Sequence, residues 1–300
     1  MDMIQNKCCR HGASLRRRRR RRRKILRSII FSCSIIAVAV FVAVGSSMIR
    51  SGDGRTNRYD VEAGNNTYDN AVIENSKISE KNKIQNNQSM LDDIMNSTQY
   101  PKQLKDLALK NEEALEFVYD YPAEHVKEHT IDLTEEASMD SVPLFVQWDK
   151  RWGYKKYSGN FFAASGCGPT TLSMVVVYLT HNREASPIAV AKYSKEAGYS
   201  VDGSGSSWTL ISEGCRHYGV KAKTVALDES RMKAELDAGH PIVINVGPGD
   251  FTDTGHFMVI TGYDDEGFSI NDPNSIEKSG KRWLFKNISS QIRAVWSMYV

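Results

Sequence analysis

The apolar pattern of this 300-residue chain changes from helical spacing to strand-like spacing, and that change restricts the folds open to it. Helical spacing predicts helices over 167–181, 187–197, 208–218 and 229–238. Strand-like runs occupy 220–227, 241–247, 256–263 and 268–272, with a turn expected at 264–267. We therefore predict an α+β fold in which helices are followed by an antiparallel sheet, rather than an alternating parallel one.

An uncharged run near the N-terminus predicts a transmembrane helix. It extends over 22 residues from Ser28 to Ile49 and follows eight consecutive arginines, Arg16 to Arg23. A helix of that length covers roughly 33 Å, enough to cross a bilayer core. The arginines hold their flank in the cytoplasm. We predict a cytoplasmic Arg-rich tail over 1–27, a membrane anchor over 28–49, and an extracellular remainder.

Two other interpretations of this N-terminal region stay open. The apolar run is also compatible with a cleaved signal peptide, with a small-residue cleavage site at 43–45. The arginines alone are compatible with a basic run that binds nucleic acid. The long charged flank favours an uncleaved anchor.

Beyond the tail, the chain is acidic. The first 50 residues hold 13 of the 39 Lys and Arg residues but only one of the 36 acidic residues. An acidic domain repels phosphate backbones, which excludes nucleic acid as its partner. The sequence predicts no oligomeric state.

The exported part divides into three by composition. Residues 50–88 are polar and Asn-rich, so we expect a flexible extracellular stem. Apolar residues at helical spacing predict a helical N-terminal segment over 89–140. A dense apolar, aromatic and glycine-containing region over 141–300 predicts the main domain.

Cys167 is the candidate nucleophile. Of five cysteines, only Cys167 and Cys215 lie in the predicted extracellular part. Cys167 precedes a buried helix with Pro169 in its first turn, and a helix N-terminus lowers the pKa of a thiol. Gly166 and Gly168 are expected to leave room for a substrate backbone. A disulfide between Cys167 and Cys215, or an inert buried Cys167, remains an alternative.

A nucleophilic cysteine needs a base and a group that orients the base. His256 starts one predicted strand, and Asp272 ends the next strand after a tight turn. A hairpin brings such residues together, so they are predicted neighbours. Asn271 is an alternative orienting residue. Asp272 also suits a simple turn before Pro273, and His256 a core position.

Three stretches resemble the C39-like cysteine peptidases of the papain-like superfamily, of the bacterial exported type. They are SGCGPTTLSMVV, GHFMVITGYDDEGFSINDPNS and VPLFVQWDKRWG. The resemblance implies a papain-like fold in which Cys167 is the nucleophile, His256 the general base and acid, and Asp272 the orienting residue. It also implies that Gln147 completes the oxyanion hole. Many papain-like enzymes have that glutamine six residues before the cysteine, where this chain has Phe161.

These observations predict a membrane-anchored extracellular cysteine peptidase that cleaves a peptide bond through an acyl-enzyme on Cys167. The alternatives are a non-catalytic papain-like binding module and a cell-wall amidase or transpeptidase using the same site. The expected partners are a peptide or cell-wall substrate and, through the anchor, the membrane. No cofactor or metal is predicted. Trp148, Trp152 and Tyr154 either line a groove or pack the domain edge.

Overall fold

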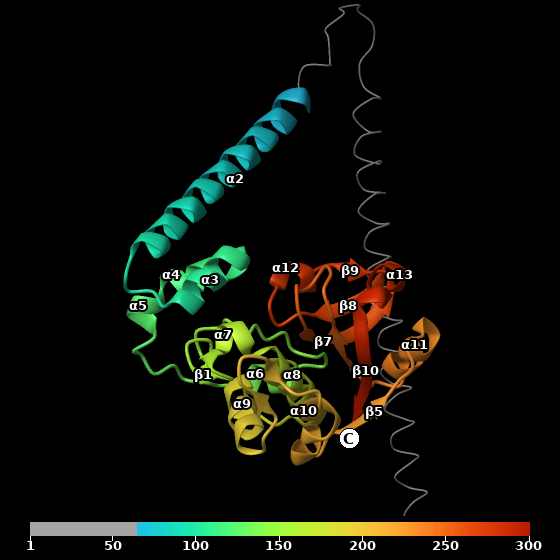
Figure 1. Cartoon of the computed structure of the whole chain (residues 1–300). Helices are drawn as coiled ribbons and strands as arrows, with labels where there is room; N and C mark the ends of the chain where they lie inside the picture. The colour runs from blue at the N-terminus through green and yellow to red at the C-terminus, as the bar shows by residue number, and fades with distance from the viewer. Residues whose placement is uncertain (1–64) are drawn as a thin grey trace, which may run out of the picture. The chain divides into compact units, whose positions relative to one another are not determined.

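The computed structural model describes residues 65–300 (Figure 1). The predicted tail over 1–27, the anchor over 28–49 and the first part of the stem lie outside the described residues. Within residues 65–300, no helix combines the length and the apolar character needed to cross a membrane.

A six-stranded antiparallel sheet forms the C-terminal half, with strand order β5-β10-β6-β7-β8-β9. Its strands are β5 (Lys221–Thr224), β6 (Ile242–Val246), β7 (His256–Asp264), β8 (Gly267–Asn271), β9 (Arg282–Trp283) and β10 (Ile292–Tyr299). Helix α8 (Cys167–Thr180) packs against β7 on one face of the sheet, and α11 (Glu229–Asp237) packs against β6 and β7 on the other (Figure 1). The predicted combination of helices with an antiparallel sheet is confirmed.

Both faces of the sheet are covered, which explains why all five residues of β6 are buried. Val243 joins the core formed with α8 (Cys167–Thr180), whereas its neighbours Ile242 and Ile244 join a second core that includes Met232 of α11. Successive strand residues point to opposite faces, so a strand between two helical layers is apolar throughout. This packing fixes where β7 lies relative to the start of α8.

Three predicted helices match the structure within one residue at either end, and one does not. They are α8, α9 (Pro187–Glu196) and α11. The helix predicted over 208–218 is instead two short pieces, α10 (Thr209–Ser212) and the 3-10 helix η2 (Gly214–Tyr218). Glu213 interrupts it with φ −126° and ψ −47°.

Strand β10 is central to the sheet although the sequence analysis did not predict it. It pairs with both β5 and β6. Its β-branched and aromatic residues, among them Val295, Trp296 and Tyr299, are a strand signal. The remaining short elements are β1 (Lys156–Tyr157), β2 (Asn160–Phe161), α7 (Phe162–Ser165), β3 (Ser200–Val201), β4 (Gly205–Ser206), α12 (Ile276–Ser279), α13 (Phe285–Ile288) and η3 (Ser289–Gln291).

The predicted stem over 50–88 is helical where the structure describes it. Helix α2 extends over Asn65–Asn96. Between residues 78 and 93 nearly every side chain is at least partly exposed, so the helix has almost no core to pack on along that stretch. Polar composition predicted the absence of burial correctly, but it does not forbid a helix, whose backbone bonds are all internal.

Short helices follow α2 and pack on the main domain. They are α3 (Lys102–Lys110), η1 (Glu112–Ala114), α4 (Leu115–Tyr119), α5 (Tyr121–Glu124) and α6 (Thr134–Ser138). Leu104 and Phe117 from this region share one core with Tyr154 and Phe161 of the main domain. Phe117 stacks on Tyr154 with ring centroids 4.2 Å apart.

Candidate active site

Cys167 is the first residue of α8, and its side chain is partly buried against the main core. The flanking glycines have a different role from the one expected. A Cβ on Gly166 would lie 2.6 Å from the Phe162 ring, and one on Gly168 would lie 2.5 Å from the Ser206 hydroxyl. The glycines therefore make room for the protein's own packing, which sets the start of α8 tightly against its neighbours.

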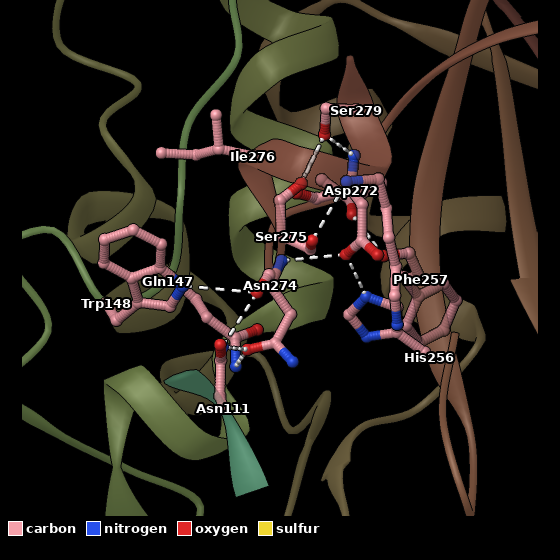
Figure 2. A network of polar contacts seen from close by, with 12 residues as sticks. Asn111, Gln147, Trp148, His256, Phe257, Asp272, Asn274, Ser275, Ile276 and Ser279 are labelled. Atoms are coloured by element: carbon pink, nitrogen blue, oxygen red, sulfur yellow. Dashed lines mark hydrogen bonds and ion pairs between the residues drawn. The ribbon is translucent and has the colours of Figure 1, made fainter. Parts of the chain in front are cut away.

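His256 and Asp272 form a buried pair at the ends of two interior strands of the sheet (Figure 2). His256 is the first residue of β7, and Asp272 follows the last residue of β8. The two strands pair in antiparallel register, which brings these positions together across the hairpin. The Nε2 of His256 lies 2.7 Å from Oδ1 of Asp272, and the Asp272 side chain is 1% exposed.

The thiol and the imidazole shift each other's pKa in opposite directions. Burial alone would raise the pKa of Cys167, but a hydrogen bond with His256, its charge, and the backbone N–H groups of Phe257 and Gly168 lower it overall. Burial alone would lower the pKa of His256, but Asp272 and Cys167 raise it overall. Because Nε2 contacts Asp272, Nδ1 is the ring nitrogen that remains for Cys167. This arrangement favours a thiolate beside an imidazolium.

Asn271, the alternative orienting residue, and two other histidines have other partners. Asn271 donates from Nδ2 to the carbonyl oxygens of Val142 and Pro143, at 3.1 and 3.0 Å, so it ties the start of the domain to β8. His240 lies 3.0 Å from the Glu235 carboxylate. His217 stacks on the ring of Tyr193. Asp272 is therefore the candidate orienting residue that contacts His256.

The alternative of a disulfide between Cys167 and Cys215 is wrong, because both cysteines are free. Cys215 lies in η2 and is fully buried. Burial raises the pKa of its thiol to about 11.

Gln147 is buried next to this pair but has other hydrogen-bond partners. Its Nε2 donates to the carbonyl oxygen of Ala163 at 2.7 Å and to Oδ1 of Asn274 at 3.3 Å. Its Oε1 is buried without a hydrogen-bond partner among the described residues, and the same is true of Oδ2 of Asp272. Buried polar atoms without partners are uncommon and cluster at functional sites.

The aromatic residues near Gln147 divide between packing and the site. Trp152 is fully buried and Tyr154 nearly so, so both are core residues. Trp148 donates from Nε1 to the carbonyl oxygen of Asn274 at 3.3 Å. Across residues 65–300, no group of three or more His, Cys, Asp or Glu side chains is placed to hold a metal ion.

The profile of the Peptidase_C39 like family matches residues 139–300, more than half of the chain. The chain belongs to the Peptidase_C39 like family. The resemblance recognised in the sequence is thus confirmed. Membership establishes a cysteine peptidase fold for the domain that carries Cys167, His256 and Asp272.

Two solved structures resemble this C39-like chain. The peptidase domain of Streptococcus ComA, a bi-functional ABC transporter involved in a quorum sensing pathway, is 19% identical, with a TM-score of 0.37. The match covers 45% of this chain and 90% of that one. A protein of Bacillus anthracis described as a C39-like peptidase is 18% identical, with a TM-score of 0.33, covering 53% and 95%. No curated protein matches the sequence.

Asn274 is the residue that sequence reasoning missed (Figure 2). Its backbone N–H donates to Oδ1 of Asp272 at 2.8 Å, and its own oxygens accept from Gln147, Trp148 and Asn111. The only local signal for the role of Asn274 is the Asx-type turn that begins at Asp272 and ends at Asn274. Asn111 comes from the helical segment, 163 residues away in sequence, and no local pattern predicts that contact.

Proposed function

We propose that this chain is a cysteine peptidase whose nucleophile is Cys167. One observation carries the proposal: His256 lowers the pKa of the Cys167 thiol, and the imidazole of His256, whose pKa is raised, lies 2.7 Å from the buried carboxylate of Asp272. A binding module has no need for a thiolate, and an inert buried cysteine has a raised pKa, as Cys215 does. Perturbed groups that share one site favour catalysis.

In the proposed reaction, the Cys167 thiolate attacks the carbonyl carbon of a peptide bond. Negative charge moves to the carbonyl oxygen, where the Cys167 backbone N–H stabilises it. The Gln147 amide is the second proposed donor. Of its two hydrogen bonds, the 3.3 Å contact with Asn274 is the weaker, so this is the one that it exchanges for the oxyanion.

His256 moves the proton in both halves of the cycle. As imidazolium it protonates the leaving amine, the C–N bond breaks, and an acyl-enzyme thioester remains on Cys167. The neutral imidazole then takes a proton from water, which attacks the thioester and releases the acid and the thiolate. Asp272 keeps Nε2 protonated and the ring oriented throughout.

The N-terminal region supports a location for this activity. We propose that residues 28–49 anchor the chain in the membrane, with the arginines on the cytoplasmic side and the peptidase domain outside the cell. The substrate is then an extracellular peptide or a cell-wall peptide.

The activity is tested on the full chain purified in mild detergent. It is incubated with a peptide library and with purified cell wall, with and without prior alkylation by iodoacetamide. We expect cleavage of peptide bonds that alkylation abolishes. Binding without turnover in the wild type would instead establish the binding module, and release of cell-wall amides or cross-linked products would establish the amidase or transpeptidase.

The location is tested on intact cells with tags at both ends. Protease added outside should digest the C-terminal domain and leave the N-terminal tag intact. Protection of the C-terminal domain until lysis would overturn the proposed topology.

A further inference from the structure

We infer that Asn111 and Glu113 are positioning residues for Asp272, so that the helical segment before the family domain is a working part of the candidate site. The inference rests on the proposed function. Both residues lie before residue 139, where the match to the family begins. Their contacts with the loop after Asp272 therefore come from outside the residues that match the family.

Glu113 holds the chain that follows Asp272. Its Oε1 accepts a hydrogen bond from the Ser275 hydroxyl, and its Oε2 accepts from the backbone N–H groups of Ile276 and Glu277, at 2.7 and 3.1 Å. One carboxylate therefore fixes three consecutive residues. Charged acceptors form stronger hydrogen bonds than neutral ones.

Asn111 holds Asn274, which lies between Asp272 and Ser275 in the chain. Its Nδ2 donates to the backbone oxygen of Asn274 at 2.9 Å and to its Oδ1 at 3.1 Å (Figure 2). Its own Oδ1 accepts from the N–H of Glu113 at 3.0 Å, as the cap of η1. This hydrogen bond fixes Asn111 and Glu113 relative to each other, and both side chains contact the loop after Asp272.

Asn274 transmits the constraint to the candidate catalytic groups. Its N–H bonds to the same oxygen of Asp272 that accepts the His256 imidazole. Its Oδ1 also accepts from Gln147. A displacement of Asn274 therefore disturbs the orienting carboxylate and the proposed oxyanion donor at once.

Loosening this loop changes the pKa values in a defined direction. Asp272 raises the pKa of His256, and the charge of His256 lowers the pKa of Cys167. When Asp272 is held less firmly, the pKa of His256 falls and that of Cys167 rises. The fraction of Cys167 present as thiolate below neutral pH then decreases.

The experiment measures alkylation of each cysteine against pH in the full chain, by iodoacetamide labelling and mass spectrometry of the digest. Asn111→Ser keeps a side-chain cap for η1 and removes the amide donor. Glu113→Ala removes the carboxylate, and Glu113→Gln keeps one acceptor oxygen. Glu112→Gln is the matched control, because the neighbouring Glu112 is exposed and its side chain accepts from Asn87 of α2.

We expect Asn111→Ser and Glu113→Ala to move the midpoint of Cys167 alkylation upward by about half a pH unit or more, which is about a threefold loss of rate at pH values below the midpoint. Glu113→Gln should recover part of the loss, and Glu112→Gln should match the wild type. A purely structural role would alter unfolding without moving the midpoint.

The outcomes separate the two claims. If wild-type Cys167 reacts no faster than Cys215 at pH 6, the proposed function fails. If wild-type Cys167 reacts fast and the Asn111→Ser and Glu113→Ala midpoints equal that of Glu112→Gln, the positioning inference fails alone. Fast labelling of Cys215 would show that a variant has partly unfolded. In that case the alkylation midpoint of Glu113→Gln decides whether the positioning inference holds.

Discussion

Cys167 and Cys215 are the same side chain in two regions of one domain, and their surroundings shift the pKa of the thiol in opposite directions. Cys215 lies in a short 3-10 helix inside the core, where burial raises the pKa to about 11. Cys167 is also desolvated, yet its pKa is lowered. The difference is the presence of an imidazole.

The comparison shows that desolvation alone raises the pKa of a thiol, as it does at Cys215. Removing water penalises the thiolate at both positions. At Cys167, the hydrogen bond and charge of His256, together with two backbone N–H groups, outweigh that penalty. The thiol pKa is therefore lowered where the partners come from two separate elements, His256 and Phe257 from β7 and Gly168 from α8.

The largest expected effect is on turnover. Cys167→Ala should lower kcat by about 10⁴-fold or more, because the group that forms the covalent bond is gone. Cys215→Ala should leave kcat within about twofold, since Cys215 only fills the core. Steady-state kinetics on any substrate found by the library screen measures both. Comparable losses in the two variants would break the comparison.

The next effect concerns the base. His256→Ala should lower kcat by a similar factor, and the Cys167→Ala/His256→Ala double variant should be hardly worse, because the two act as one unit. His240→Ala is the matched control, since His240 also contacts a carboxylate, that of Glu235, but lies away from Cys167 in a separate hydrogen-bonded pair. A loss in His240→Ala equal to that in His256→Ala would contradict the assignment.

Alkylation of the two thiols should differ by a smaller factor. The thiolate fraction rises as pH passes upward through each thiol pKa, and the pKa of Cys167 lies below its usual value while that of Cys215 lies near 11. At pH 7 Cys167 should therefore react at least about 100-fold faster with iodoacetamide. Labelling at equal rates in the folded chain would show that His256 does not activate Cys167.

The smallest expected effect is on the free energy of unfolding, and here Cys215→Ala should lose more than Cys167→Ala. Cys215→Ala leaves a void in the main core and should lower the free energy of unfolding by about 1 kcal/mol. Cys167→Ala should change it by less than about 0.5 kcal/mol, because functional residues contribute little to stability. Urea unfolding of both variants measures this. A greater loss in Cys167→Ala would mean that Cys167 is a packing residue.

Local sequence patterns predicted much of the fold and of the site. Helical and strand-like spacing located α8, α9, α11, β6, β7 and β8 within a few residues, because an amphipathic period directly reflects which face is buried. The pairing of His256 with Asp272 followed from a hairpin, which is also a local structure. The missed strand β10 has a strand signal in its own residues, so the sequence does contain the information needed to predict it.

By itself, then, the sequence determined the α+β plan, the membership in the C39-like family, and the placement of a cysteine, a histidine and an aspartate at the ends of regular elements. Only the tertiary structure decided what surrounds them. It showed that Gly166 and Gly168 serve packing, and that Asn111 and Glu113 hold the loop after Asp272. The contacts of Asn111 and Glu113 with this loop join residues 163 positions apart in sequence. Spacing along a chain carries no information on such pairs, because their proximity arises only when separate elements pack.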